Sequence, residues 1–421
     1  MHITILIGNY YPNYSAVGNC AKNFSEALER MGHDVTIVSQ RTSLAEEKQI
    51  EWPQSIYRID TFFLRCILRG QEKGRLSSLV GLFGRTVRYA QSILQRRNVK
   101  WDIVKAYIRE LNLVEQHKPI DVIVPFCFPF EGVLAAATFR QQGKYTVNVV
   151  PFLFDRFAAS DALHRTEWNG KRKMAAHVRL EKGAFSRCNR VLMMPSWKKH
   201  VHQFYPELEH KFVEVEHPLL IPINSQKHVD YDSTRLNIVF TGSLLKIIRS
   251  PLNSFHSLAV AINERPEICV HLYARGNCED DIREFMRQCP EQVVYHGSVD
   301  IETAHAAMKA ADILLSVGNS NITQMASKNF EYVATGSPVI HFYCDENDPV
   351  NALLAKMGNC LMLSQHDTPE QNGKAIIRYL ESQPVKHSFQ EVAEIIPEAL
   401  PETTAKILID TLSDKSKFQN L

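Results

Sequence analysis

The sequence predicts an α/β protein of two Rossmann-like domains, each built on a parallel sheet, and three observations lead to this fold class. The chain has 421 residues, which is more than one ordinary domain holds. Short apolar runs alternate with helical patterns in both halves, as in parallel sheets covered by helices on both faces. A polar stretch, 224–235, interrupts the alternation, and we interpret it as a linker between domains 1–223 and 236–395. We expect residues 396–421 to form a C-terminal helix that packs back on the N-terminal domain.

The N-terminal half opens with a strand–loop–helix–strand unit. Residues 3–7 form an apolar run of strand length, a polar loop follows, and a helical pattern over 17–31 ends at Gly32. Residues 34–38 are the next strand. Further strands are expected at 121–126, 146–154 and 191–195.

The C-terminal half repeats the alternation. Strands are expected at 236–240, 268–273, 292–295, 312–316 and 338–343, and helices near 251–264, 279–288, 302–310, 324–335, 375–383 and 402–413. Ligands of such sheets bind at the carboxyl ends of the strands, so the loops after the strands, facing a cleft between the domains, are where we expect the functional site.

The composition of the chain excludes or disfavours several classes of protein. Hydrophobic residues make up 45% and charged residues 22%, and the net charge of +2 gives no overall field that would favour nucleic acid. The nine cysteines form no CxxC pair and no secretory signal precedes them, which favours a reducing cytoplasm over a disulfide framework or a zinc site. No apolar run reaches the roughly 18 residues that span a bilayer, so any membrane contact should be peripheral.

Gly242 comes at the end of a predicted strand, and Ser243, Lys246 and Arg249 follow it. A glycine at a strand end lets the backbone approach a diphosphate, and two nearby cations would neutralise it. A plain turn with solvated basic side chains is the alternative, and these residues alone do not decide between the two.

The segment 327–340, Ser-Lys-Asn-Phe-Glu-Tyr-Val-Ala-Thr-Gly-Ser-Pro-Val-Ile, has the most specific pattern. Ser327 is a suitable N-cap for a helix over 328–335. Lys328 stands where the helix dipole disfavours a cation, which makes sense beside a bound anion. Glu331, one turn further, can accept hydrogen bonds from ribose hydroxyls. A capped amphipathic helix with a surface lysine and glutamate is the alternative.

This segment resembles the signature of GT-B glycosyltransferases of the retaining family-four group (glycosyl transferases group 1). Residues 9–18, 27–28, 32–35, 180–191 and 240–243 resemble other parts of that family in the same order. The resemblance implies transfer of a sugar from a nucleoside-diphosphate sugar, most often UDP-linked, to a hydroxyl of a glycan or lipid-linked acceptor in bacterial surface polysaccharide synthesis. It implies no metal and no cofactor, because the nucleotide sugar is a substrate. Residues 1–223 would be the acceptor side and 236–395 the donor side.

The resemblance also implies roles for individual residues. Glu331 would hold the donor ribose, and Lys246 and Arg249 would neutralise the leaving diphosphate. The other residues implied at the donor are Gly18, Gly242, Ser243, His296, Val299, Ser327 and Lys328, with His296 and Val299 along the nucleobase and Gly18 facing the diphosphate from the N-terminal domain.

One position departs from the family pattern. Members usually carry two glutamates eight positions apart, and eight positions before Glu331 this chain has Thr323. Asn319, Asn321 or Gln324 could supply neutral hydrogen-bonding groups in its place. The donor sugar and the stereochemical outcome therefore stay open.

Asp155 follows a predicted strand, near the position where the family sets an acid or a histidine beside the reacting sugar. It could orient or deprotonate the acceptor hydroxyl. A loop cap or an ion pair with Arg156 is the alternative, and His164 is the nearest other base. Asp230 and Asp232 have the Asp-x-Asp spacing of metal-dependent GT-A transferases, but they precede a strand, and we interpret them as part of a solvated linker.

Residues 62–100 hold nine cations against the single acid Glu72, with apolar residues between them. A basic amphipathic stretch is typical of a surface that lies on anionic lipid, at about 1 kcal/mol per cation. Ordinary helices with a solvated basic face are the alternative. With the lipid interpretation, the protein would be cytoplasmic and peripheral on the inner face of the membrane.

Three other functions share parts of this sequence pattern. A nucleotide-sugar 2-epimerase shares the double-Rossmann plan, but it needs several acid–base residues around the sugar, and candidates are scattered. An NAD-linked dehydrogenase is rejected, because Gly8 and Gly18 do not form Gly-x-Gly-x-x-Gly and no acid ends the second strand. A non-catalytic nucleotide-sugar-binding relative is consistent with the missing first glutamate.

Overall fold

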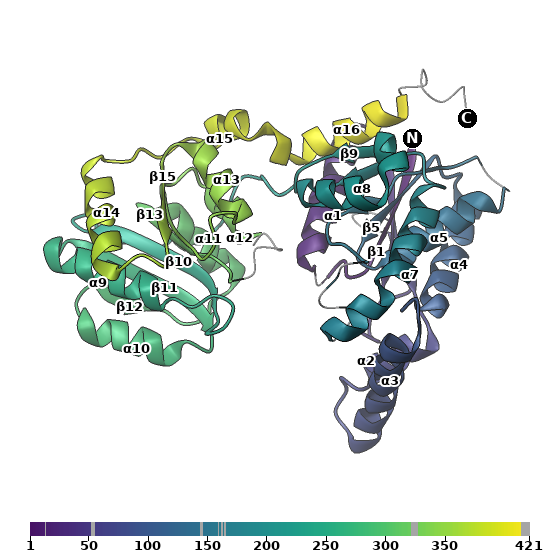
Figure 1. Cartoon of the computed structure of the whole chain (residues 1–421), viewed down its shortest axis with the longest axis horizontal. Helices are drawn as coiled ribbons and strands as arrows, with labels where there is room; N and C mark the ends of the chain where they lie inside the picture. Colours follow the sequence, from purple (N-terminus) through teal and green to yellow (C-terminus); the bar gives the residue numbers. More distant parts are fainter. Residues whose placement is uncertain are drawn as a thin grey trace. The chain divides into compact units, whose positions relative to one another are not determined.

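The computed structural model describes residues 1–12, 14–51, 55–143, 146–158, 160, 163, 166–320 and 327–413. The chain divides into two compact units. Unit 1 comprises Met1–Pro218 together with the chain from Pro401 onward, and unit 2 comprises Leu219–Leu400. Each unit is a sheet covered by helices (Figure 1).

The sheet of unit 1 follows the order β3-β4-β2-β1-β5-β7-β8-β9, with β6 beside β5. All of its pairs are parallel except β3 with β4. The strands are β1 (His2–Ile7), β2 (Asp34–Gln40), β3 (Gln49–Ile50), β4 (Ser55–Ile59), β5 (Val122–Cys127), β6 (Asn148–Val149), β7 (Phe152–Leu153), β8 (Val191–Met193) and β9 (Phe212–Glu214). The central strands β1 and β5 are buried along their whole length, as near-continuous apolar runs in a sheet covered on both faces should be.

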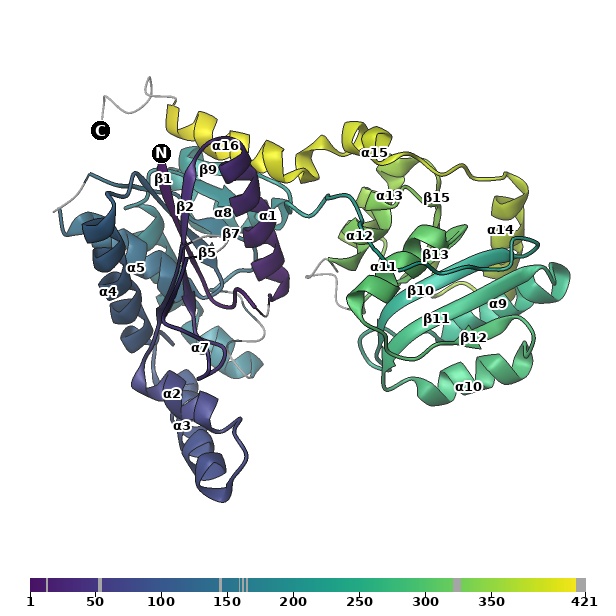
Figure 2. The same cartoon turned by 180° about the vertical axis from the view of Figure 1, so that it is seen from behind.

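Helices cover both faces of this sheet. They are α1 (Ala16–Arg30), α4 (Trp101–His117), α5 (Phe130–Gln141), α7 (Glu167–Phe185), α8 (Lys198–Phe204) and α16 (Pro401–Ser413), with short 3-10 turns η1 (Pro195–Trp197) and η2 (Pro206–Lys211). Helices α4, α5 and α7 lie together on one side, and α1 lies with α16 on the other (Figures 1 and 2). An ion pair between Arg30 and Glu402, 2.6 Å long, joins α1 to α16.

The basic stretch forms a helical hairpin of α2 (Phe62–Arg69) and α3 (Arg75–Leu94), which stands out from the rest of unit 1 (Figure 2). The two helices touch through Gly70 and Gly81. A Cβ on Gly81 would lie 2.3 Å from the Cα of Gly70, so this close packing requires glycine.

Unit 2 has the sheet order β12-β11-β10-β13-β14-β15, with every pair parallel. The strands are β10 (Leu236–Leu244), β11 (Ile268–Gly276), β12 (Val293–Tyr295), β13 (Ile313–Val317), β14 (Val339–Tyr343) and β15 (Cys360–Ser364). The helices are α9 (Leu252–Glu264), α10 (Glu279–Gln288), α11 (Ile301–Ala310), α12 (Lys328–Ala334), α13 (Pro349–Met357), α14 (Pro369–Glu381) and α15 (Phe389–Ile395), with the turn η3 (Pro397–Ala399). One core packs α9, α10 and α14 on the sheet, and a second packs α11, α12, α13 and α15 on its other face.

Several expected boundaries differ from those observed. The expected linker 224–235 packs on unit 2: Lys227 pairs with Asp300 at 2.7 Å, and the hydroxyl of Tyr231 donates to that of Tyr273 at 3.1 Å. The polar residues of this segment therefore indicate that it lies at the surface of unit 2. They do not indicate a linker that stands apart from the unit. Accordingly, the units divide after Pro218 and after Leu400.

Two elements also differ in extent. The expected strand 146–154 is two short strands, β6 and β7, separated at Val150 and Pro151, because proline has no N–H to donate to the ladder. Strand β10 continues through Gly242 to Leu244, so Gly242 and Ser243 lie in the end of the strand and not in a loop after it.

Candidate functional site

The sheet order of unit 2 places a topological switch point between β10 and β13, where open α/β sheets bind ligands. The loops after these two strands are joined there. The backbone N–H of Ser320 donates to the carbonyl of Ile248 at 2.7 Å, and its hydroxyl donates to the carbonyl of Ile247 at 3.0 Å. The loop with the expected cations is thereby fixed to the loop after β13.

Arg249 and Asn319 form the centre of this junction. The guanidinium donates from Nε and Nη2 to Oδ1 of Asn319, at 3.0 and 2.9 Å, and from Nη1 to the carbonyl of Ser243 at 3.4 Å. Burial lowers the pKa of Arg249, although this group remains a cation at neutral pH. The structure therefore brings together Ser243, Arg249 and Asn319, three of the residues expected at the donor.

Gly242 lies beside them in a conformation that favours glycine. Its φ is +148°, and a Cβ built there would lie 3.6 Å from the ring of Phe240 and 4.0 Å from Nη1 of Arg249. A side chain would thus be disfavoured by the backbone and would stand in front of the guanidinium. The glycine leaves Arg249 accessible from the end of β10.

Lys246 points elsewhere, and a second arginine takes the place next to Ser243. The ammonium of Lys246 lies 3.6 Å from Oδ2 of Asp280 and is about half exposed. Arg275, at the end of β11, donates from Nε to the hydroxyl of Ser243 at 3.0 Å. The sequence analysis expected the site in the loops after the strands but did not single out Arg275; a cation at the carboxyl end of a strand is the signal that could have found it.

Glu331 on α12 is held by the side chains of Lys328 and His305. Its Oε2 lies 2.8 Å from Nζ of Lys328 and 3.3 Å from Nε2 of His305 on α11. Burial acts to raise the pKa of Glu331, but the hydrogen bond from His305 and the charge of Lys328 outweigh it and lower the pKa below its ordinary value. Glu331 is therefore an ionised carboxylate at neutral pH. His305 was not predicted, because no local pattern connects it with a residue 26 positions away.

The start of α12 corrects one detail. Ser327 is the N-cap residue, but its side chain makes no capping hydrogen bond and its backbone is already helical. Helix α12 is tied to β10 by Tyr332, whose hydroxyl accepts from the N–H of Thr241 at 2.8 Å and contacts its carbonyl at 3.2 Å. Burial raises the pKa of Tyr332 to about 12, so the phenol stays protonated.

A series of buried polar contacts joins α12 to β13 and β14. Ser316 on β13 donates to Asn329 on α12 at 2.9 Å, and Nδ1 of His341 on β14 contacts the same hydroxyl at 2.9 Å. The other ring nitrogen of His341 lies 3.7 Å from a carboxylate oxygen of Asp348, which also caps α13. These contacts fix the strand that precedes Asn319.

His296 belongs to a stack of rings. It lies parallel to Tyr273 at 4.1 Å between centroids, and its Nε2 is 3.2 Å from Nδ1 of His271. Desolvation lowers the pKa of both histidines. The electrostatic effect of His296 and Arg235 lowers the pKa of His271 further, to about 4. Val299, two residues after Gly297, packs against the core under α11 and α12.

In unit 1, Gly18 was expected to face the diphosphate, and the structure shows that it is also needed for packing. Its N–H donates to the hydroxyl of Ser15 at 3.0 Å in the first turn of α1. A Cβ there would lie 2.7 Å from the carbonyl oxygen of Asn9, so only glycine allows α1 to pack on the loop after β1.

Asp155 follows β7 and is half-buried. Burial raises the pKa of this carboxyl, while His217 acts to lower it. His217 in turn lies 2.6 Å from Glu216 through Nδ1. Sequence reasoning did not single out His217, because it stands outside every motif and approaches Asp155 only through the fold.

Four further expected residues lie outside the part of the chain that the structure describes: Gln324, Asn321, Thr323 and His164. The two aspartates of the linker do not converge: Asp230 pairs with His228 at 2.8 Å, and Asp232 bonds Thr234.

The described residues contain no group of three or more His, Cys, Asp and Glu that could hold a metal ion. Among the same residues, no helix is long and apolar enough to cross a membrane.

Comparison with known proteins shows similarity in structure and not in sequence. No family model matches the chain, and no curated protein matches it. Among solved structures, sucrose-phosphate synthase from Thermosynechococcus elongatus aligns over 98% of both chains with 10% identity and a TM-score of 0.61. The lipopolysaccharide outer core galactosyltransferase WaaB aligns over 99% of this chain and 100% of its own, with 11% identity and a TM-score of 0.57.

The chain has the GT-B fold. Its two units, each with a mostly parallel sheet in Rossmann order, correspond to the two domains of that fold. The same fold is shared by UDP-GlcNAc 2-epimerase from Methanocaldococcus jannaschii, which aligns over 98% of this chain and 99% of its own, with 11% identity and a TM-score of 0.54. Identities this low establish the fold alone.

Proposed function

We propose that this GT-B protein is a glycosyltransferase that moves a sugar from a UDP-linked donor to a hydroxyl of a glycan or lipid-linked acceptor. The observation that carries the proposal is the ionised Glu331, oriented by Lys328 and His305 on the same sheet edge as the fixed Arg249. A nucleoside diphosphate presents two ribose hydroxyls and a diphosphate. A carboxylate and a rigid guanidinium are suitable partners for these two groups.

Each side chain has one role in this proposal. Both contacts to Glu331 go to Oε2, so Oε1 is directed to the ribose hydroxyls. Arg249 and Arg275 meet the diphosphate at the glycine end of β10, and Lys246 reaches it by leaving the exposed Asp280. Asn319 holds Arg249, with Gln324 as a further neutral group toward the sugar. His296 and Val299 lie on the nucleobase side.

The proposed chemistry needs no protein nucleophile and no metal. The bond between the anomeric carbon and the diphosphate oxygen breaks, and a bond from that carbon to the acceptor oxygen forms. With retention of configuration, the acceptor proton passes to the leaving phosphate, whose negative charge Arg249 stabilises. Asp155, with a raised pKa, orients the acceptor hydroxyl from unit 1.

We place this activity in bacterial surface polysaccharide synthesis on the inner face of the membrane. The support is the α2–α3 hairpin of unit 1, which exposes a row of apolar side chains among its cations. The exposed residues of α3 include Leu76 (75%), Leu79 (62%), Leu82 (55%) and Phe83 (53%). An apolar face of this kind with flanking arginines suits an anionic lipid surface.

The test begins with a thermal-shift panel of UDP-, GDP-, ADP- and CMP-sugars. A ligand at a hundred times its Kd stabilises a protein by about 2.7 kcal/mol. We expect a UDP-sugar to stabilise the wild type and the Glu331→Ala variant to lose this response. Glu264→Ala, which removes an exposed carboxylate at the far end of α9, is the matched control and should respond like the wild type. Stabilisation that survives Glu331→Ala would refute the site.

An epimerase is the second candidate, because an epimerase shares the fold. The two activities give different products from a UDP-linked N-acetylglucosamine. An epimerase forms the 2-epimer without releasing UDP, whereas a transferase releases UDP in proportion to acceptor. Epimer formation without UDP would replace the transferase proposal.

A further inference from the structure

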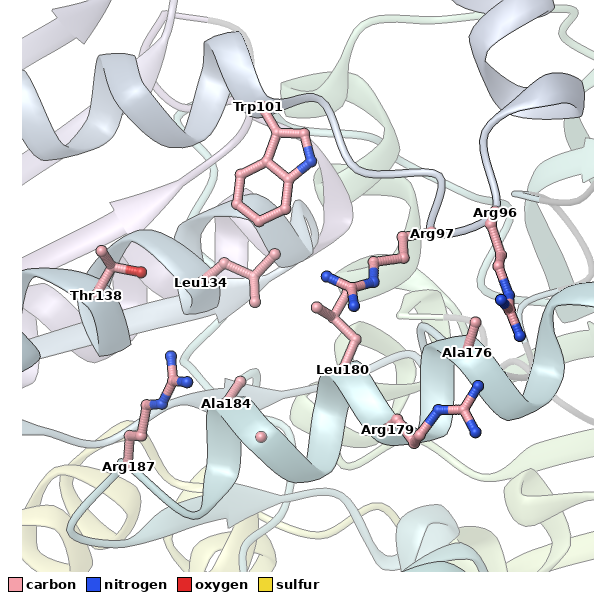
Figure 3. A pocket seen from close by; sticks show the side chains of 11 residues that line it. Arg96, Arg97, Trp101, Leu134, Thr138, Ala176, Arg179, Leu180, Ala184 and Arg187 are labelled. Carbon is pink, nitrogen blue, oxygen red and sulfur yellow. The ribbon is translucent and has the colours of Figure 1, made fainter.

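Unit 1 holds a cavity of about 420 Å³ among its helices. It lies between α5, α7 and the segment 95–101 that leads into α4 (Figure 3). Four arginines line it: Arg96, Arg97, Arg179 and Arg187. We call it the arginine cavity.

The four guanidinium groups have no partner among the residues that the structure describes. Within the described residues, none of them makes a hydrogen bond or an ion pair, and none of the residues that line the cavity is acidic. In Figure 3, Arg97 reaches into the middle of the cavity, Arg96 and Arg179 face each other at one end, and Arg187 stands at the other. Like charges so close together repel one another, and a bound anion would remove that repulsion.

The rest of the lining is apolar. Trp101, Leu134 and Leu180 project into the cavity together with small residues of α7. The indole of Trp101 is about half exposed, although it borders the cavity. A simple inorganic ion would contact the arginines and leave this apolar surface in water. The lining is complementary to an anion that carries an apolar group.

The fold holds two of the arginines in place. The carbonyl of Ser92 at the end of α3 accepts from Asn169 Nδ2 at 3.1 Å and from the buried ammonium of Lys173, and that of Ile93 accepts from Arg172. These three donors lie on α7, which also carries Arg179. Helix α3 is thereby fixed on α7 just before Arg96 and Arg97.

The cavity also continues the exposed apolar face of the hairpin. Leu94, the last residue of α3, is 78% exposed and lies two positions before Arg96, and Tyr89, five positions before Leu94, is 52% exposed. A molecule held in the cavity by its anionic group could keep its apolar part along these side chains.

We propose that the arginine cavity binds a phosphorylated amphiphile, with the phosphate between Arg97 and Arg179 and the apolar part against Trp101 and Leu180. Arginine matches this group because its planar fork bonds two phosphate oxygens at once. The site is separate from the proposed donor site and does not rest on glycosyl transfer.

The test measures binding of three probes to the full chain by calorimetry and by co-flotation. The probes are inorganic phosphate, dihexanoyl phosphatidic acid below its micelle concentration, and phosphatidylcholine vesicles with and without phosphatidic acid. The test variant is Arg97→Glu with Arg179→Glu. The control, Lys199→Glu with Lys374→Glu, makes the same charge change at two exposed lysines outside the cavity. Circular dichroism and the thermal unfolding midpoint without ligand check that each variant folds.

We expect the wild type to bind the short-chain phosphatidic acid, and the test variant to bind it at least about ten-fold more weakly, as loss of charged hydrogen bonds implies. The control should bind like the wild type. Arg97→Lys with Arg179→Lys is a milder substitution that keeps both positive charges. This variant should lose part of the affinity for the short-chain phosphatidic acid. If the vesicles bind but the soluble lipid does not, a bilayer surface and not the cavity is the ligand, and the proposal fails. Equal affinity for inorganic phosphate, or no loss in the test variant, also overturns it.

Discussion

The carboxyl edge of unit 2 and the arginine cavity of unit 1 both gather cations but hold them differently. At the carboxyl edge, Arg249 is fixed by Asn319 and Lys328 by Glu331. In the arginine cavity, Arg97 and its three neighbours have no partner within the described residues. A paired cation keeps its geometry without a ligand, so a ligand binds with little rearrangement. Unpaired cations repel one another, and their arrangement indicates a ligand that supplies the missing charge.

The largest effect should follow from removing the paired arginine. Arg249→Ala loses the charged hydrogen bonds proposed for the diphosphate, and we expect UDP to bind about 10 to 100 times more weakly. Arg249→Lys keeps the charge but cannot hold Asn319 with two nitrogens, so its affinity for UDP should lie between those of the wild type and Arg249→Ala. Calorimetric titration with UDP measures both, and Arg283→Ala on the exposed face of α10 is the control. Wild-type affinity in Arg249→Ala would place the diphosphate elsewhere.

A second effect should follow from breaking the tie between α12 and β10. Tyr332→Phe leaves the buried N–H of Thr241 without its acceptor, which costs roughly 1–3 kcal/mol. Urea unfolding should show this loss. Because α12 carries Glu331, the variant should also bind UDP more weakly. Unchanged stability with unchanged binding would show that Tyr332 does not position the helix.

The ring stack should make stability depend on pH. The pKa of His271 is about 4 in the folded protein and 6.5 in its ordinary state. The unfolded chain therefore takes up a proton first as pH falls, so the stabilisation is complete above about pH 6.5 and declines toward pH 4. Between pH 6.5 and about 5, above the range where carboxylates titrate, we expect a loss of about 1–2 kcal/mol. His271→Gln should flatten this part of the unfolding curve; an unchanged slope would assign it to another group.

The smallest effect is expected in the arginine cavity. Arg179→Gln removes a repelling charge that has no partner among the described residues, so the free energy of unfolding should stay within about 0.5 kcal/mol of the wild type or rise. Arg88→Gln in the same unit is the contrast, because Arg88 donates to Asp102 at 2.9 Å and is nearly buried. We expect that variant to lose roughly 1–3 kcal/mol. A similar loss in both would show that Arg179 has a structural partner after all.

Much of this fold could be predicted from the sequence, and less of the site. The alternation of apolar runs and helices is a local pattern, and it identified five of the six strands of unit 2. The exception is β15, whose half-buried residues at the sheet edge make a weak signal. Segment 327–340 identified α12 for the same reason, because its helical pattern and its closing glycine are neighbours in the chain. The linker assignment differed because a polar stretch such as 224–235 can pack on a unit through hydrogen bonds without an apolar core.

Local patterns were sufficient for the two-domain plan and for the glycine at the end of β10. The role of Glu331 came from the resemblance of segment 327–340 to a family signature, and it stays a prediction. Only the tertiary structure paired Arg249 with Asn319, brought His305 to Glu331, and placed Arg275 beside Ser243. The arginine cavity likewise draws its charges from two segments more than eighty positions apart. The physical reason is that strand and helix patterns depend on neighbouring residues, whereas the meeting of distant side chains depends on strand register and on which helices pack together.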